Sequence, residues 1–335
     1  MDSGILFEMR AAHRRSGFSV SQGILGASLS VVLLTGCAST PDPDPRYRPS
    51  ESVLEVMAVL RRHVPDDTYR FEPATDFTGR NVYRSSLLRL ESLETIHTDT
   101  LRAGHMDGVI AFAKGRSLER LRAYELAAQE YRLAAELDPE LAVEAGRSHD
   151  VCTELAEITE IGVGLDELAA SVAIGIDADA MSDRYDERAR RLAELERLTE
   201  GTHHVYIVRE EIERTDVAKA QYFMATRQVL PNGDVRAAAE LQRVVIQNKD
   251  SKHSNQHVLG LAELYEDLAF EYLDAYPPES LEFDPARFQE LVEATTRLYE
   301  LVSGQDGKPE RLEASRRLEA FLAFVLRVDR DRFTR

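Results

Sequence analysis

Hydrophobic residues recur every three or four positions along most of the chain beyond residue 50, and this spacing predicts helices. The first predicted helix covers residues 51–64, where Val53, Val56 and Leu60 share one face and Pro65 ends the pattern. The same spacing predicts further helices at residues 81–101, 106–120, 124–136, 183–200 and 217–229. We therefore expect an all-α fold for residues 51–335.

The sequence indicates few strands, because few stretches alternate between apolar and polar residues. The best candidates, residues 206–208 and 244–246, are short enough to lie inside helices. Helix boundaries are clearer. A Pro-Asn-Gly turn within residues 230–233 ends one helix, and Asp234 can cap the next. Asp284-Pro285 combines a capping side chain with a proline suited to the first helical turn, so it predicts another helix start.

One segment carries a more specific pattern, in which small, aromatic and proline residues stand at fixed offsets. The positions are Gly115, Ala127, Tyr131, Ala134 and Pro139. Small residues let two antiparallel helices approach closely, the tyrosine fills the space between them, and the proline ends the second helix. The pattern resembles a tetratricopeptide repeat, with its clearest unit at about residues 106–139. The resemblance implies a TPR-like α-helical solenoid of antiparallel hairpins.

The strict period of the repeat does not continue, but its triplet recurs. Weaker versions stand at Ala218, Tyr222 and Ala225 and at Ala294, Leu298 and Leu301. About three units must stack for stability, so we expect degenerate helical hairpins around one good repeat. The apolar stretch at residues 312–328 is expected to cap the array or to form a dimer surface.

The start of the chain has the features of a targeting segment. Three arginines precede an apolar run at residues 18–34, which is shorter than a spanning helix requires. The run ends in Leu34-Thr35-Gly36-Cys37, which resembles the lipobox of bacterial lipoproteins. The resemblance implies that residues 1–36 are a cleaved signal peptide and that Cys37 carries the lipid, including palmitate. An uncleaved signal anchor is the alternative, and the start codon can be Met1 or Met9.

Residues 37–50 join the lipidated cysteine to a proline-rich tether. Alternate prolines keep this segment extended, so residues 38–50 reach about 40 Å from the membrane. The lipobox implies a protein held in the cell envelope by its lipid anchor. Ala38, where an aspartate would favour inner-membrane retention, favours the periplasmic face of the outer membrane. In a bacterium with one membrane the same motif implies the outer face of the plasma membrane.

Composition narrows the possible partners. The chain has a net charge of −18, and removal of residues 1–36 leaves −19. Such a charge repels phosphate backbones, so we expect no nucleic acid partner. With Cys37 assigned to lipid, Cys152 is the single remaining cysteine, and we expect it to pack in a helix interface as a small apolar side chain.

No complete catalytic, metal or phosphate motif is present, so we expect no enzyme activity, no cofactor and no metal. His253 and His257 have the spacing of a metal pair, but their surroundings indicate a solvated loop or a helix start. The neighbours His203 and His204 are expected to lie at the surface. The acidic run that begins at Asp177 lacks the turn glycine of a calcium loop, and residues 162–164 lack a phosphate-binding context.

The function expected from this architecture is binding of another envelope protein, as a scaffold or assembly factor. Arg116 and Arg120 are the candidate partner-binding residues, because they could hold a carboxylate or an acidic peptide. The alternative is that both pair with local glutamates such as Glu119. A second functional class is a small-ligand-binding accessory lipoprotein of a solute transporter, which would need a cavity lined by tyrosine and arginine.

Overall fold

The computed structural model describes residues 48–64, 66–161 and 178–333, with side chains as far as Asp329. The signal peptide, Cys37, all but the last three residues of the tether, Asp177 and residues 162–164 lie outside these ranges. None of the helices in the described part has the length and apolarity needed to cross a membrane.

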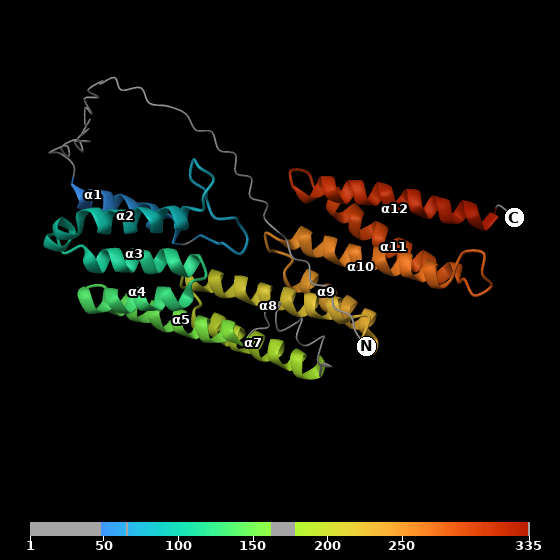
Figure 1. Cartoon of the computed structure of the whole chain (residues 1–335), viewed down its shortest axis with the longest axis horizontal. Coiled ribbons are helices and arrows are strands. Elements are labelled where there is room, and N and C mark those ends of the chain that lie inside the picture. The colour runs from blue at the N-terminus through green and yellow to red at the C-terminus, as the bar shows by residue number, and fades with distance from the viewer. Residues whose placement is uncertain (1–47, 65, 162–177, 334–335) are drawn as a thin grey trace, which may run out of the picture. The chain divides into compact units, whose positions relative to one another are not determined.

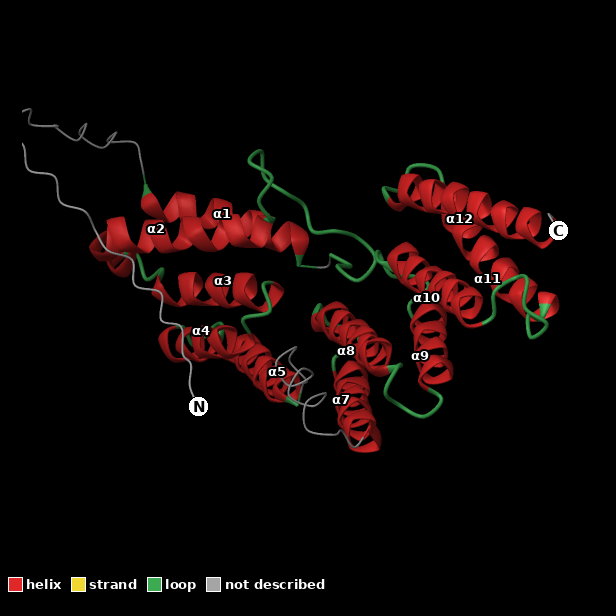
Figure 2. Cartoon of the chain, turned by 45° about the vertical axis from the view of Figure 1, so that its right-hand side comes forward, coloured by secondary structure: helices red, strands yellow, loops and turns green. Residues whose placement is uncertain are grey.

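The described residues form eleven helices, shown in Figures 1 and 2. They are α1 (Pro49–His63), α2 (Val82–Ala103), α3 (Asp107–Arg120), α4 (Tyr124–Leu137), α5 (Ala142–Glu160), α7 (Ala178–Leu198), α8 (His204–Thr226), α9 (Gly233–Gln247), α10 (Ser254–Ala275), α11 (Pro285–Ser303) and α12 (Glu310–Phe333). Each packs against the next one in this order. The expected all-α class is therefore confirmed, and the sequential packing is consistent with an α-helical repeat.

No strand forms within the described residues, where a single isolated bridge joins Thr75 to Asn81. The two strand candidates, residues 206–208 and 244–246, lie inside α8 and α9. The helix predicted at residues 217–229 is the second half of α8, which starts at His204. Its start was missed because the buried polar residues of α8 interrupt the apolar pattern.

Two predicted helix starts have different outcomes. Asp284 caps α11 as expected, since its side chain accepts hydrogen bonds from the backbone N–H groups of Ala286 and Arg287. Asp234 does not cap α9, because the helix begins one residue earlier at Gly233. A Cβ atom on Gly233 would lie 1.8 Å from the carbonyl oxygen of Arg227, so this tight turn accepts glycine alone.

The α3–α4 hairpin has close helix packing. A Cβ atom on Gly115 would lie 2.9 Å from the ring of Tyr131, so the ring occupies the space that a larger residue would need. Ala127 and Ala134 are fully buried beside Tyr131. In α4, Asp138 is the C-cap residue and Pro139 follows it. The weak triplet in α11 is displaced by one position, since the structure buries Thr295, Tyr299 and Val302 instead.

A buried carboxylate joins the middle helices. Glu211 of α8 is fully buried and accepts hydrogen bonds from Arg122, Arg188 and Tyr124, which belong to the α3–α4 turn, α7 and α4. Arg214, one turn further along α8, also donates to Glu211. Removing this negative charge would leave a buried arginine without its counter-ion.

The segment between α1 and α2, residues 66–81, crosses to the start of α10, and Figure 2 shows its course. We call this segment the strap. The carbonyl oxygen of Thr68 accepts a hydrogen bond from the side chain of Lys252. The carbonyl oxygen of Tyr69 accepts one from the backbone N–H of the same lysine. The hydroxyl of Tyr69 donates to Asn248 at 3.4 Å. The strap therefore joins residues that lie 184 positions apart in the chain.

Candidate functional site

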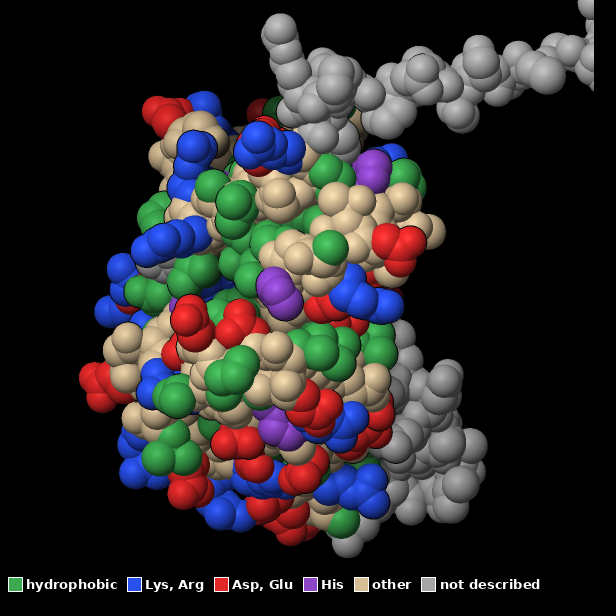
Figure 3. Space-filling view, turned by 90° about the vertical axis from the view of Figure 1, so that its left-hand side faces the viewer, with side chains coloured by type: hydrophobic (Ala, Val, Ile, Leu, Met, Phe, Trp, Pro, Cys, Tyr) green, Lys and Arg blue, Asp and Glu red, His purple; other side chains and the backbone are tan. Residues whose placement is uncertain are grey.

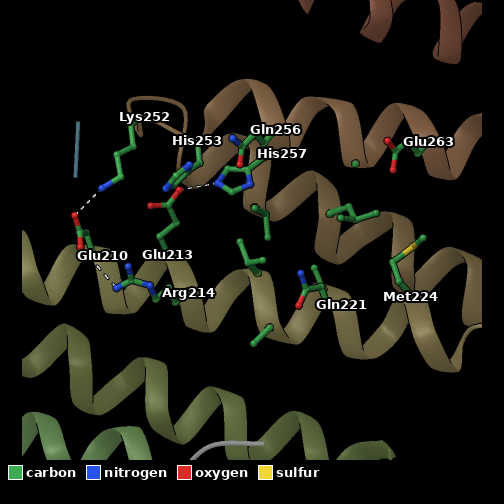
Figure 4. A pocket seen from close by; sticks show the side chains of 16 residues that line it. Glu210, Glu213, Arg214, Gln221, Met224, Lys252, His253, Gln256, His257 and Glu263 are labelled. Atoms are coloured by element: carbon green, nitrogen blue, oxygen red, sulfur yellow. Dashed lines mark hydrogen bonds and ion pairs between the residues drawn. The ribbon is translucent and has the colours of Figure 1, made fainter. Parts of the chain in front are cut away.

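A cavity of about 630 Å³ lies between α8, α9, α10 and the loop that precedes α10 (Figure 4). We call it the groove. Val217, Ala218 and Met224 of α8 and Leu241 and Val244 of α9 form its apolar wall. Helical spacing explains this wall, because residues three, four or seven apart face the same side of a helix.

Charged residues surround one end of the groove, and Figure 4 shows them paired with one another. Lys252 donates to Glu210 at 2.9 Å, and His257 Nε2 bonds to Glu213 Oε1 at 2.6 Å. Burial raises the pKa of Glu213, but hydrogen bonds from His257 and Ser251 outweigh burial and leave that pKa below its usual value. The groove thus combines an apolar wall with an end whose charges are already compensated.

The structure places His253 and His257 at the start of α10. His253 is the N-cap residue of α10 and His257 lies in the first turn, so the helix-start interpretation is confirmed. His257 is not solvated, however, since its ring is mostly buried and bonds to Glu213. The local sequence could not show this bond because Glu213 lies 44 residues earlier.

A second cavity of about 200 Å³ shares Glu210, Arg214, Lys252 and His253 with the groove. Two tyrosines and two further arginines line it: Tyr83, Tyr124, Arg120 and Arg122. Arg120 donates to Thr68 Oγ1 and to the carbonyl oxygen of Val64, and its guanidinium lies over the ring of Tyr83. This is the lining that the small-ligand alternative requires.

Arg116 lies elsewhere, inside the fold. Its guanidinium donates to Glu119 at 3.2 Å and to Glu144 at 3.1 Å, and the residue is 8% exposed. The alternative of pairing with local glutamates therefore describes Arg116. Arg120 has no such ion pair in the described residues and lies at the wall of the smaller cavity.

His203 and His204 correct the sequence interpretation, which placed them at the surface. Both are buried, and their ring centroids are 3.7 Å apart. Their Nε2 atoms lie 2.8 Å and 3.4 Å from the two carboxylate oxygens of Glu119. His203 is the N-cap and His204 the first residue of α8, and both rings turn toward Glu119 of α3.

The charge state of this cluster follows from burial and from its neighbours. Burial raises the pKa of Glu119, but His203 and Arg116 outweigh burial and leave that pKa well below its usual value. Burial also lowers the pKa of His203 to about 4. Near pH 7 the cluster therefore holds an anionic carboxylate beside a neutral imidazole.

Cys152 is fully buried in the core of the α3–α5 region, as expected. Burial raises the pKa of its thiol well above the usual value, so the thiol is protonated. Its Sγ atom lies 3.9 Å from Glu119 Oε2.

Figure 3 shows one face of the molecule, on which acidic and basic side chains are interspersed and hydrophobic side chains gather between them in the upper half. This face has no broad patch of one charge. Recognition on it would therefore depend on shape and apolar contact more than on net charge.

No protein-family model matches the chain, and no curated protein sequence is significantly similar to it. The likeness to lipoproteins and to tetratricopeptide repeats accordingly depends on the residues quoted above.

Proposed function

We propose that this chain is a membrane-anchored lipoprotein that binds a segment of another cell-envelope protein in the groove between α8, α9 and α10. The observation that supports this function best is the groove itself. Its volume of about 630 Å³ is in the range of ligand-binding clefts, and its wall is apolar. The proposal has three further parts. TPR-like hairpins form the folded domain, the lipobox cysteine anchors it, and the tether holds the groove away from the membrane.

The groove indicates the chemistry of the bound segment. Lys252 is paired with Glu210, and His257 with Glu213, so a charged ligand gains little at this end. An apolar side chain gains more, since it covers Val217, Met224 and Leu241. The expected segment is a helix or extended strand with one or two apolar anchors and a polar remainder.

Crosslinking in membranes followed by affinity purification tests this function. Met224→Lys places a charge on the apolar wall and should reduce recovery of the partner at least about tenfold, the equivalent of 1.4 kcal/mol. Leu126→Lys is the matched control, because Leu126 is an exposed apolar residue of α4 that does not line the groove. Equal recovery of the partner with both variants would contradict the proposal.

The anchor is tested separately by Cys37→Ala. This variant should no longer incorporate labelled palmitate and should lose the crosslinked partner while the fold is unchanged. A Cys37→Ala protein that still incorporates labelled palmitate would contradict lipid attachment at this residue.

The smaller cavity favours a second candidate function, capture of a small ligand for a transporter. Tyr83, Tyr124, Arg120 and Arg122 line it beside the groove. Native mass spectrometry of the purified chain distinguishes the two functions. A bound small molecule that Arg120→Gln removes, with no protein partner recovered, would replace protein binding by ligand capture.

A further inference from the structure

The cluster formed by Glu119, His203 and His204 brings together three side chains that bind transition metals. One ligand atom from each lies within 4.8 Å of the others, and all three residues are buried. Atoms that each bind a zinc ion at about 2.0–2.2 Å are about 3–4 Å apart. The separations of 2.8 Å and 3.4 Å from Glu119 to the two imidazoles fit this geometry after a small adjustment.

His204 supplies a second, independent observation. Its Nε2 atom is buried and points toward Glu119, whose Oε2 atom lies 3.4 Å away, yet it completes no hydrogen bond among the described residues. A buried polar atom without a partner is costly, and it marks a place where a ligand or ion would gain a bond. Thr202 Oγ1 lies 3.5 Å from Nδ1 of the same ring, the kind of contact that orients a metal-binding histidine.

Arg116 is the group that competes with an ion for this position. Its Nη1 atom contacts the ring of His203 and also donates to Glu119, so it now supplies the positive charge that the buried carboxylate needs. Its Nη2 atom already bonds to Glu144, which is partly exposed on α5. A small rotation toward Glu144 would keep Arg116 paired, and Glu119, which also accepts a hydrogen bond from Tyr131, could then bind an ion.

The cluster adjoins a cavity. Glu119 lies in the wall of the cavity of about 200 Å³ that adjoins the groove. An ion entering from that cavity would meet a carboxylate first and the two imidazoles behind it.

We propose that Glu119, His203 and His204 bind one divalent transition-metal ion of the zinc type. Neutral imidazole and carboxylate are the donors that suit such an ion. The site joins α3 to the start of α8, so the bound ion would hold together two halves of the chain that are separated by residues 162–177. This inference does not depend on the function proposed for the groove.

Cobalt(II) tests the site directly, because tetrahedral cobalt gives visible absorption that zinc displaces. The untagged full chain should bind one cobalt ion, and one equivalent of zinc should abolish the absorption. His204→Gln should weaken binding about 100-fold or more, the share of one ligand in a typical zinc site. His257→Gln is the matched control, since His257 is also largely buried against a glutamate but lies outside the cluster.

A variant that folds poorly does not decide the question alone, so Arg116→Gln provides a second test. It removes the competing guanidinium, and zinc should then raise the midpoint of thermal unfolding more than it does for the unchanged chain. Two results would overturn the site: no visible cobalt absorption with no zinc-dependent rise in the midpoint, or equal binding by the unchanged chain and His204→Gln.

Discussion

Glu211 allows the sharpest test of how the middle helices are held together. Glu211→Gln keeps the size of the side chain and removes its charge, so Arg188, which is also buried, loses its counter-ion. Breaking a buried ion pair from one side costs about 3–5 kcal/mol. Arg122 and Arg214 are nearly half exposed and can turn to solvent, which places the expected loss near the lower limit, about 3 kcal/mol.

Thermal unfolding followed by far-UV circular dichroism measures this loss. A cost of about 3 kcal/mol should lower the midpoint by roughly 6–12 °C. Arg122→Gln is the control, since it removes an exposed partner and leaves Glu211 paired with Arg188 and Arg214, so it should cost less than about 1 kcal/mol. A Glu211→Gln protein that melts within about 1 °C of the unchanged chain at pH 7 would refute the reasoning.

The pH dependence of stability is a second test of the ion pairs formed by Glu211. Burial raises the pKa of Glu211, but the hydrogen bond from Arg122 and the nearby arginine charges outweigh it, so the folded pKa lies below the ordinary 4.5. A carboxylate with a lowered folded pKa stabilises the fold above about pH 4.5 and loses that contribution as the pH falls through the folded pKa. The difference in stability between the unchanged chain and Glu211→Gln should therefore shrink below pH 4.5.

Three other contacts can be tested by single substitutions. Gly115→Val crowds the Tyr131 ring and should cost about 1–3 kcal/mol in urea unfolding, whereas Gly146→Ala, whose Cβ atom meets nothing within 4 Å, should cost nothing. In Lys252→Met a protease should cut the strap several-fold faster than in the unchanged chain. Equal cutting rates in the two proteins would show that the side-chain bonds of Lys252 do not hold the strap. Asp284→Ala should cost about 1 kcal/mol, which Asp284→Ser should largely restore.

The helical class was predictable because it depends on local spacing. Pro65 and Asp284 mark helix boundaries through their own backbone chemistry, so they needed no knowledge of distant residues. The register of α11 was missed by one residue for a physical reason. Thr295 is buried because its hydroxyl donates to the carbonyl oxygen of Leu291 in its own helix, while Leu301 remains exposed.

The groove and the buried cluster were not predictable from local patterns. The groove needs three helices whose lining residues extend from Glu210 to Glu263, and no short motif contains them. The cluster needs Glu119 beside His203, which lies 84 residues later in the chain. The adjacent histidines alone could have drawn attention to the site, but the assumption that they face different directions on a regular element was wrong.

The bond between Lys252 and the strap has a consequence for how the chain acquires its structure. It joins residues 184 positions apart, whereas most other helix contacts join neighbours. At about 5–20 residues per second, a ribosome needs roughly 10–40 s to make the intervening chain. The first hairpins can form in that time, so the strap closes after them, and a folding phase slower than hairpin formation should carry its signal.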